Sequence, residues 1–168
     1  MTLSDNLRNA LTTFEGIALI GPRSDTKTRE LAIPDVLGPN LPNVDVTVSL
    51  TESIPPNAKV KLQGGGRFLH WFEHLIGTAQ VHLSTKDGQP AIMGEDNIRY
   101  LAGWPDDATF DAIIGGLCDT LDITTYSLPD GLRIRDTDTH RFIFNYAPKA
   151  QSWGDVIIPA AGVHWEAL

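Results

Sequence analysis

The short apolar run from Ile17 to Ile20 limits the folds open to this chain more than any other part of the sequence. A run of this kind, without polar alternation, is typical of a central strand buried on both faces of a sheet. It follows Gly16, a residue type that commonly ends a helix, and the apolar residues between 3 and 14 recur at helical spacing. Gly21-Pro22 ends the run and a polar loop begins. Helix, glycine, buried strand and loop form half of a βαβ unit, which predicts an α/β fold.

Two helices are expected from their capping residues and apolar periodicity. Ser4 or Asp5 is suited to cap the first helix, because both side chains accept hydrogen bonds from free backbone amides. Asp106 or Asp107 is suited to cap the second helix, over residues 108–121, whose apolar positions lie on one face. Strands are expected over residues 44–50, 59–62, 81–83, 91–93 and 98–102, whereas residues 67–76 fit either a helix or a strand.

The character of the sequence changes after Thr124. Four short strands are expected there, separated by Pro129-Asp130-Gly131 and by polar loops, at Leu132/Ile134, Phe142/Phe144, Val156–Ile158 and Val163/Trp165. This pattern is typical of a small antiparallel β unit. We therefore expect two domains, one of residues 1–123 with an open sheet and one of residues 124–168.

The composition excludes several classes of partner and location. The net charge is −8 and the 13 Lys and Arg residues are scattered, so nucleic acid is not expected as a partner. No apolar stretch approaches the roughly 18 residues that span a bilayer, and the N-terminus lacks the features of a signal peptide. The single cysteine, Cys118, falls on the apolar face of the second helix and indicates no disulfide framework. We expect a cytoplasmic protein without a membrane association.

The segment His70-Trp71-Phe72-Glu73-His74 matches the zinc-binding pattern H-x-x-E-H. On a helix this spacing places the two histidines on one face, where both can bind the metal. His70 and His74 would be two metal ligands, and Glu95 or Asp119 would have to supply the third. In the alternative interpretation the histidines are solvated and Trp71 packs inward. Because a five-residue pattern arises easily by chance and no helix cap precedes it, we expect no metal here.

The polar loop after the apolar run is the candidate ligand site. Open α/β sheets bind ligands where loops leave the carboxyl ends of strands, and residues 23–27 occupy such a position. Arg23, Ser24 and Lys27 are the candidate ligand-binding residues, suited to an anion or a sugar hydroxyl. In the alternative interpretation the charged residues form ion pairs at a subunit contact. The glutamates of the chain mostly adjoin loop signals and are expected to be solvated.

Six segments in one order resemble the C-terminal portion of glycoside hydrolase family 42 β-galactosidases. Residues 14–28 are similar to a helix, strand and loop of the trimerisation domain, and Trp71 and Glu73 fit a W-x-E position. The other segments are 37–42 with 52–54, 87–91, 98–105, 128–135 and 142–146, of which the last two resemble the small β domain. The resemblance implies the later half of a flavodoxin-like trimerisation domain followed by a small antiparallel β domain.

The same resemblance implies that the catalytic residues are absent from this chain. Family members place two catalytic glutamates on a (β/α)8 barrel, which needs roughly 250 residues, and the sequence has no Asn-Glu pair to match the family acid/base. The enzymes hydrolyse terminal β-galactosides without a cofactor. We therefore expect no catalytic residue, no cofactor, negligible hydrolysis by the chain alone, and a role in subunit assembly with another copy or a barrel subunit. The alternative is a free-standing module that binds a carbohydrate, such as a galactoside, or a protein through the 23–27 loop and aromatics such as Trp104 or Trp153.

Overall fold

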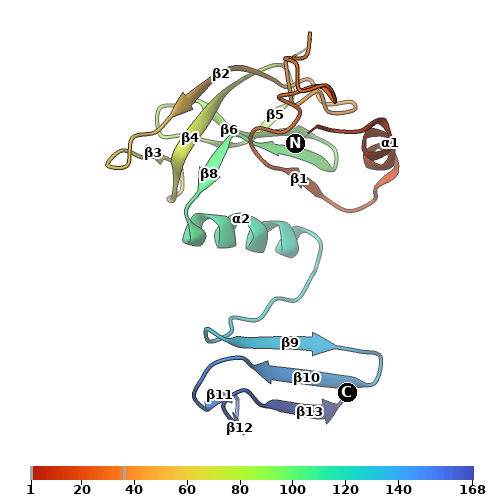
Figure 1. Cartoon of the computed structure of the whole chain (residues 1–168), viewed down its shortest axis with the longest axis vertical. Helices are drawn as coiled ribbons and strands as arrows, with labels where there is room; N and C mark the ends of the chain where they lie inside the picture. Colours follow the sequence, from red (N-terminus) through yellow and green to blue (C-terminus); the bar gives the residue numbers. More distant parts are fainter. Residues whose placement is uncertain (1, 36) are drawn as a thin grey trace. The chain divides into compact units, whose positions relative to one another are not determined.

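The computed structural model describes residues 2–35 and 37–168 of the chain and consists mostly of β-strands, with two helices (Figure 1). It divides into two compact units, Met1–Ile123 and Thr124–Leu168. Each unit has its own cluster of buried apolar side chains. The high strand content is consistent with the expected small antiparallel β domain.

The described residues of the first unit form both helices and eight strands. In chain order they are α1 (Asp5–Thr13), β1 (Ala18–Ile20), β2 (Thr47–Ser53), β3 (Val60–Lys61), β4 (Arg67–Ile76), β5 (Gln80–Ser84), β6 (Pro90–Glu95), β7 (Ile98–Leu101), β8 (Gly103–Pro105) and α2 (Asp107–Thr120). The ambiguous segment 67–76 is thus a ten-residue strand. Neither helix in the described part of the chain is long and apolar enough to cross a membrane.

The first sheet of this unit has the order β1-β7-β6-β5. Strand β1 pairs in parallel with β7, and among the described strands this is the only parallel pair. The prediction of a central, doubly buried strand at 17–20 is wrong, because β1 lies at the end of the sheet and its three residues are only partly buried. The Asp87-Gly88 hairpin joins β5 to β6 as its turn signal indicates.

The second sheet is built around β4, which pairs with β2, β3 and β8. The pairing of β4 with β8 shifts register between Leu69 and Phe72, and His70 lies in this bulge with a left-handed φ of 67°. A bulge changes which face a side chain occupies. Beyond it, Phe72, Glu73 and Leu75 are all buried, whereas His74 is partly exposed.

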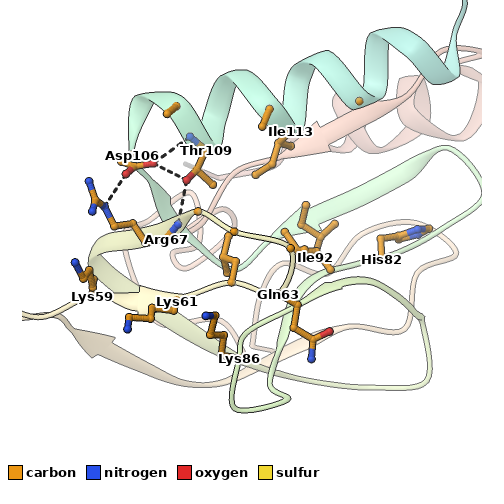
Figure 2. Close-up of a pocket in the computed structure, with 18 of the residues that line it drawn as sticks. Lys59, Lys61, Gln63, Arg67, His82, Lys86, Ile92, Asp106, Thr109 and Ile113 are labelled. Atoms are coloured by element: carbon orange, nitrogen blue, oxygen red, sulfur yellow. Dashed lines mark hydrogen bonds and ion pairs between the residues drawn. The ribbon is translucent and has the colours of Figure 1, made fainter.

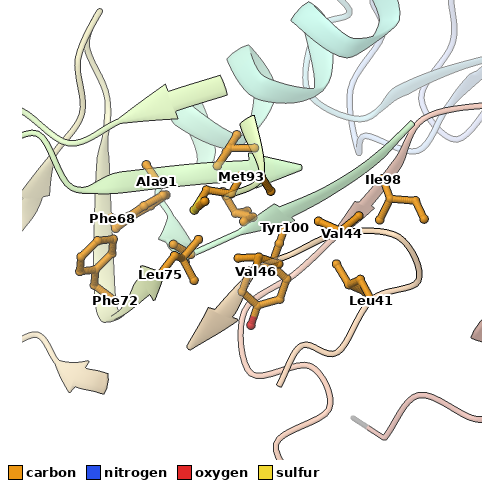
Figure 3. Close-up of a cluster of buried hydrophobic side chains, with 14 of the residues drawn as sticks. Leu41, Val44, Val46, Phe68, Phe72, Leu75, Ala91, Met93, Ile98 and Tyr100 are labelled. Atoms are coloured by element: carbon orange, nitrogen blue, oxygen red, sulfur yellow. The ribbon is translucent and has the colours of Figure 1, made fainter. Parts of the chain in front are cut away.

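The main core lies where the two sheets meet (Figure 3). Phe68 and Phe72 of β4 stack with ring centroids 5.9 Å apart, and Tyr100 of β7 is fully buried. The segment before β2 adds Leu41, Val44 and Val46, although only β2 itself is a strand. The burial of these large side chains is the main stabilising contribution to the unit.

Both helices begin where the sequence predicts. The Ser4 side chain accepts a hydrogen bond from the Leu7 amide, and Asp106 accepts one from the Thr109 amide. The apolar face of α2 is less buried than its periodicity suggests, because Thr109 is its only buried residue. Phe110 is 46% exposed and Cys118 is partly buried.

The second unit contains five short strands in two antiparallel sheets. They are β9 (Leu132–Asp136), β10 (His140–Asn145), β11 (Gln151–Trp153), β12 (Val156–Ile158) and β13 (Val163–Ala167). Four of them follow the predicted segments, and β11 was not predicted. The three-stranded sheet has the order β13-β10-β9, and β11 pairs with β12. Its core is small, with Leu132, Ile143 and Ile158 almost completely buried.

Candidate functional site

The site is built around the loop that leaves β1. The backbone turns sharply there, with left-handed φ angles of 61° at Arg23 and 55° at Asp25. Residues other than glycine rarely adopt this conformation, so surrounding contacts must hold the loop in place. Segment 37–39 packs close against it, since a Cβ added to Gly38 would lie 2.7 Å from the carbonyl oxygen of Ser24.

A buried carboxylate on β4 holds the loop by hydrogen bonds. Glu73 of β4 is fully buried, and its two oxygens accept the Arg23 amide at 3.1 and 3.2 Å. The hydroxyl of Tyr100 donates to the second oxygen at 2.6 Å. A buried carboxylate is costly without such donors. The expectation that the glutamates are solvated is therefore wrong for Glu73.

The electrostatic effect of this arrangement falls on Tyr100. Burial, followed by the nearby carboxylate of Glu73 and the hydrogen bond between the two groups, raises the pKa of the Tyr100 phenol well above its ordinary value. The phenol therefore remains a hydrogen-bond donor to Glu73 throughout the physiological range.

A second polar contact attaches α1 to the same loop. Asp25 is 5% exposed; one of its oxygens accepts the Leu3 amide at 3.0 Å, and the other forms an ion pair with Arg8 of α1. Arg8 also donates to the backbone carbonyl of Asn40. The loop, the first helix and segment 37–42 are thus joined by hydrogen bonds to one another.

Aromatic side chains lie beside the loop at the surface. The guanidinium carbon of Arg23 lies 5.6 Å from the ring centroid of Trp71, and Trp71 meets Trp104 edge to face at 5.5 Å. Trp104 is 49% exposed, whereas Nε1 of Trp71 is buried and has no hydrogen-bond partner among the described residues. A cation on an aromatic face is a stabilising contact and leaves flat apolar surface next to polar donors.

The structure separates the three candidate ligand-binding residues. The side chains of Arg23 and Lys27 are exposed, whereas Ser24 is 6% exposed. The Lys27 carbonyl accepts a hydrogen bond from the hydroxyl of Thr2 at 2.9 Å. Of the three side chains, those of Arg23 and Lys27 reach the surface, and Ser24 belongs to the packed side of the loop.

The zinc pattern lacks the geometry it requires, because residues 70–74 lie on a strand and not on a helix. Glu73 points into the core, and Nε2 of His74 lies 2.8 Å from the Glu52 carboxylate. His70 neighbours Trp71 in the bulge. Within residues 2–35 and 37–168, no three His, Cys, Asp or Glu side chains are grouped to hold a metal ion, with Glu95 and Asp119 included in that search.

The pairing of Glu73 with Tyr100 was not found from the sequence. The two residues are 27 positions apart, and only the contact between β4 and β7 brings them together. The one available signal was the W-x-E segment, which the family resemblance had already singled out.

Comparisons with known proteins identify relatives of the chain. No protein-family model matches it. A β-galactosidase of Thermus thermophilus is 36% identical over 141 residues, which are 81% of this chain and 22% of that enzyme. The β-galactosidase BgaH of Haloferax lucentense is 25% identical over 162 residues, covering 86% of this chain and 24% of the relative.

Solved structures give the same result. The β-galactosidase of the psychrophile Marinomonas ef1 matches 96% of this chain with a TM-score of 0.83 and 28% identity, over 27% of its own length. A catalytic mutant of Gan42B, a family 42 β-galactosidase of G. stearothermophilus, matches 98% of the chain with a TM-score of 0.76 over 30% of its length, and at 15% identity the likeness is one of fold. The chain thus spans less than a third of the length of these relatives, and the predicted resemblance to the C-terminal part of β-galactosidases is confirmed.

Proposed function

We propose that this homologue of the C-terminal part of family 42 β-galactosidases acts in subunit assembly and carries no catalytic residue of its own. Its partner is a second copy of the chain or a catalytic barrel subunit. The enzyme it would serve hydrolyses terminal β-galactosides with glutamates that lie outside the matched part. The proposal extends to the fold: the first unit is the later half of a flavodoxin-like trimerisation domain, which the parallel β1–β7 pair supports.

The observation that carries the proposal is the position of β1 at the end of its sheet. Its partner in the described residues is β7, on one side only. An unpaired strand edge presents backbone donors and acceptors that another chain can pair with. The amide of Ala18 donates to the Asn97 carbonyl at 2.7 Å, on the β7 side. Because successive residues of a strand alternate in direction, the amide of Leu19 points to the open side.

A proline at position 19 tests this edge. Leu19→Pro removes an amide that β7 does not use, and proline is tolerated at strand edges for this reason. Ala18→Pro is the matched disruptive variant, since it removes the amide bonded to Asn97. Sedimentation velocity should find the unaltered chain self-associated, or bound to a family 42 barrel subunit. The Leu19→Pro chain should dissociate from the partner and keep its near-ultraviolet circular dichroism.

Two results would count against assembly as the function. One is an unaltered chain that stays monomeric at high concentration and does not bind a barrel subunit. The other is turnover of an aryl β-galactoside by the purified chain above the rate of a heat-inactivated control.

A second candidate function, sugar binding at the loop, is favoured by one observation. Arg23, Trp71 and Trp104 lie together, so a pyranose ring could pack its apolar face on the indoles while the guanidinium donates to its hydroxyls. Calorimetry with galactose and lactose should then give saturable heats that Arg23→Ala lowers and the exposed Arg29→Ala leaves unchanged. Absence of heat with both sugars would reject it.

A further inference from the structure

A cavity of about 830 Å³ lies within the first unit, between α2 and the loops and strands that face it (Figure 2). It is separate from the Arg23 loop, since none of the residues that line it belongs to that site. Pockets of 300–1,000 Å³ with mainly apolar walls and a few polar groups are the usual form of small-molecule sites. The size of this cavity falls within that range.

The walls of the cavity are mostly apolar. Figure 2 shows Ile113 of α2 directed toward Ile92 of β6. The further apolar lining residues are Leu62, Leu83, Ala108, Ala112 and Leu117. These side chains form a hydrophobic surface that α2 leaves partly uncovered. Thr109 is the only residue of the helix that is buried.

The amino-terminal end of α2 is firmly attached to the loop that borders the cavity. The Arg67 amide donates to the Thr109 hydroxyl at 3.0 Å, and the Arg67 side chain contacts Asp106 at 2.6 Å. Gly66 has a φ of 82°, and a Cβ there would lie 2.6 Å from the Thr109 hydroxyl oxygen. The cavity mouth is therefore formed by a constrained backbone.

The charge of the cavity is opposite to that of the chain. Five of the 13 Lys and Arg residues line it, namely Lys59, Lys61, Arg67, Lys86 and Arg99. The one lining carboxylate is that of Asp106, which already pairs with Arg67. Throughout residues 2–35 and 37–168, no ion pair or side-chain hydrogen bond involves the ammonium groups of the three lysines. Three lysines whose ammonium groups pair with no carboxylate among the described residues form a positive rim that attracts anions, although the chain has a net charge of −8.

Two polar atoms of lining residues also lack partners. Nε2 of His82 and Nε of Arg99 are buried and bond to nothing among the described residues. Burial, followed by the charge of Arg99, lowers the pKa of His82, which keeps its ring neutral near pH 7. An unpaired buried polar atom costs free energy that a bound polar group can recover.

We propose that this cavity binds a small amphiphilic organic anion. Its apolar body lies between α2 and β6, and its carboxylate, sulfonate or phosphate group lies at the rim formed by Lys59, Lys61 and Lys86.

Two dyes with the same aromatic body separate the apolar from the ionic contribution. The probes are 1-anilinonaphthalene-8-sulfonate and the uncharged N-phenyl-1-naphthylamine, each titrated by fluorescence. The sulfonate should bind saturably at one site and more tightly than the uncharged dye. Its affinity should fall as salt is added, because exposed charges are screened.

Matched variants locate the site. Replacing Lys59, Lys61 and Lys86 by Gln should weaken sulfonate binding about fivefold or more, at a few tenths of a kcal/mol per lost charge, and leave the uncharged dye unchanged. Replacing Arg133, Arg135 and Lys149 of the second unit by Gln changes the net charge equally and should have no effect. Ala112→Trp fills the cavity and should abolish binding of both dyes, whereas Ala150→Trp should not.

Three outcomes would overturn the proposal. Equal binding of the two dyes, unaffected by the lysine changes, would mark an apolar surface without anion recognition. Equal weakening by the two triple variants would mark a general charge effect. The third outcome is dye binding that weakens as the protein concentration rises, together with an Ala112→Trp chain that is monomeric. This combination would mean that a second copy of the chain fills the cavity.

Discussion

The hydroxyl of Tyr100 donates a 2.6 Å hydrogen bond to a Glu73 carboxylate oxygen, and both side chains are fully buried. Glu73 in turn accepts the Arg23 amide, so the hydrogen bonds run from β7 through β4 to the surface loop.

Removing the phenol should destabilise the first unit. Tyr100→Phe leaves the Glu73 carboxylate with one donor fewer in a buried setting, which should lower the free energy of unfolding by about 1–3 kcal/mol. Urea denaturation measures the change. The matched control is Tyr146→Phe, because Tyr146 is 71% exposed and the change should alter the stability little. Equal stabilities of Tyr100→Phe and the unaltered chain would contradict the structural role of the bond.

The advantage of tyrosine over phenylalanine at position 100 should depend on pH. Because the pKa of Tyr100 is raised in the folded state, its contribution is complete below the ordinary tyrosine value of about 10. Above that pH the unfolded chain ionises its phenol and the folded chain does not, so the free energy of unfolding falls. The difference between the unaltered chain and Tyr100→Phe should therefore shrink from about pH 10 upward. A difference that stays constant across this range would be inconsistent with the raised pKa.

The Arg8–Asp25 pair should control attachment of α1. Arg8→Gln leaves the nearly buried Asp25 carboxylate without its cation, which should cost about 1–3 kcal/mol of stability. Hydrogen exchange should become faster at the amides of α1 and at the Leu3 amide, which donates a hydrogen bond to Asp25. Arg29→Gln is the control, since the exposed Arg29 side chain forms no ion pair among the described residues. Unchanged exchange in α1 would disprove the attachment.

Asp106 should make α2 sensitive to acid. Hydrogen bonds from the Thr109 hydroxyl and amide, aided by Arg67, hold the pKa of Asp106 below its ordinary value. A lowered pKa in the folded state contributes stability above the unfolded value of about 4, and this is lost as pH falls through the folded value. At neutral pH, Asp106→Asn should therefore show less helical circular dichroism than the unaltered chain. Under acid conditions the signals of the two chains should become similar. A pH-independent difference would argue against the cap.

The two units should respond separately to core mutations. Leu132→Ala removes a fully buried side chain from the small cluster of the second unit and should cost about 2–5 kcal/mol there. The described cores share no residue, so amide resonances of β4 and β7 should keep their positions in a ¹H–¹⁵N spectrum. Loss of dispersion throughout the spectrum would show that the units unfold together.

Local signals predicted much of this fold. Ser4 and Asp106 cap their helices because capping depends on neighbouring amides, and Asp87-Gly88 closes a hairpin because turn geometry depends on two residues. The position of β1 in its sheet was not predictable in this way. Burial of a strand depends on which segments pair beside it, and a run of apolar residues is equally compatible with an edge.

The candidate site was predicted less completely for the same reason. The polar loop after the apolar run was predicted, but the burial of Ser24 depends on packing by segment 37–39, which the sequence of the loop does not report. The burial of Glu73 depends on Tyr100, which a distant strand supplies. Helix α2 was predicted, but its apolar face is less buried than expected, because periodicity does not report how closely a sheet approaches a helix.

The Glu73 carboxylate holds position 23 by accepting a hydrogen bond from the backbone amide, and the guanidinium takes no part in that bond. Any residue that tolerates the left-handed φ of 61° at this position can donate the same amide, so the side chain can change within that limit while the turn keeps its shape. A chain built in this way can change the chemistry of its surface loop, one substitution at a time, without rebuilding the fold beneath it.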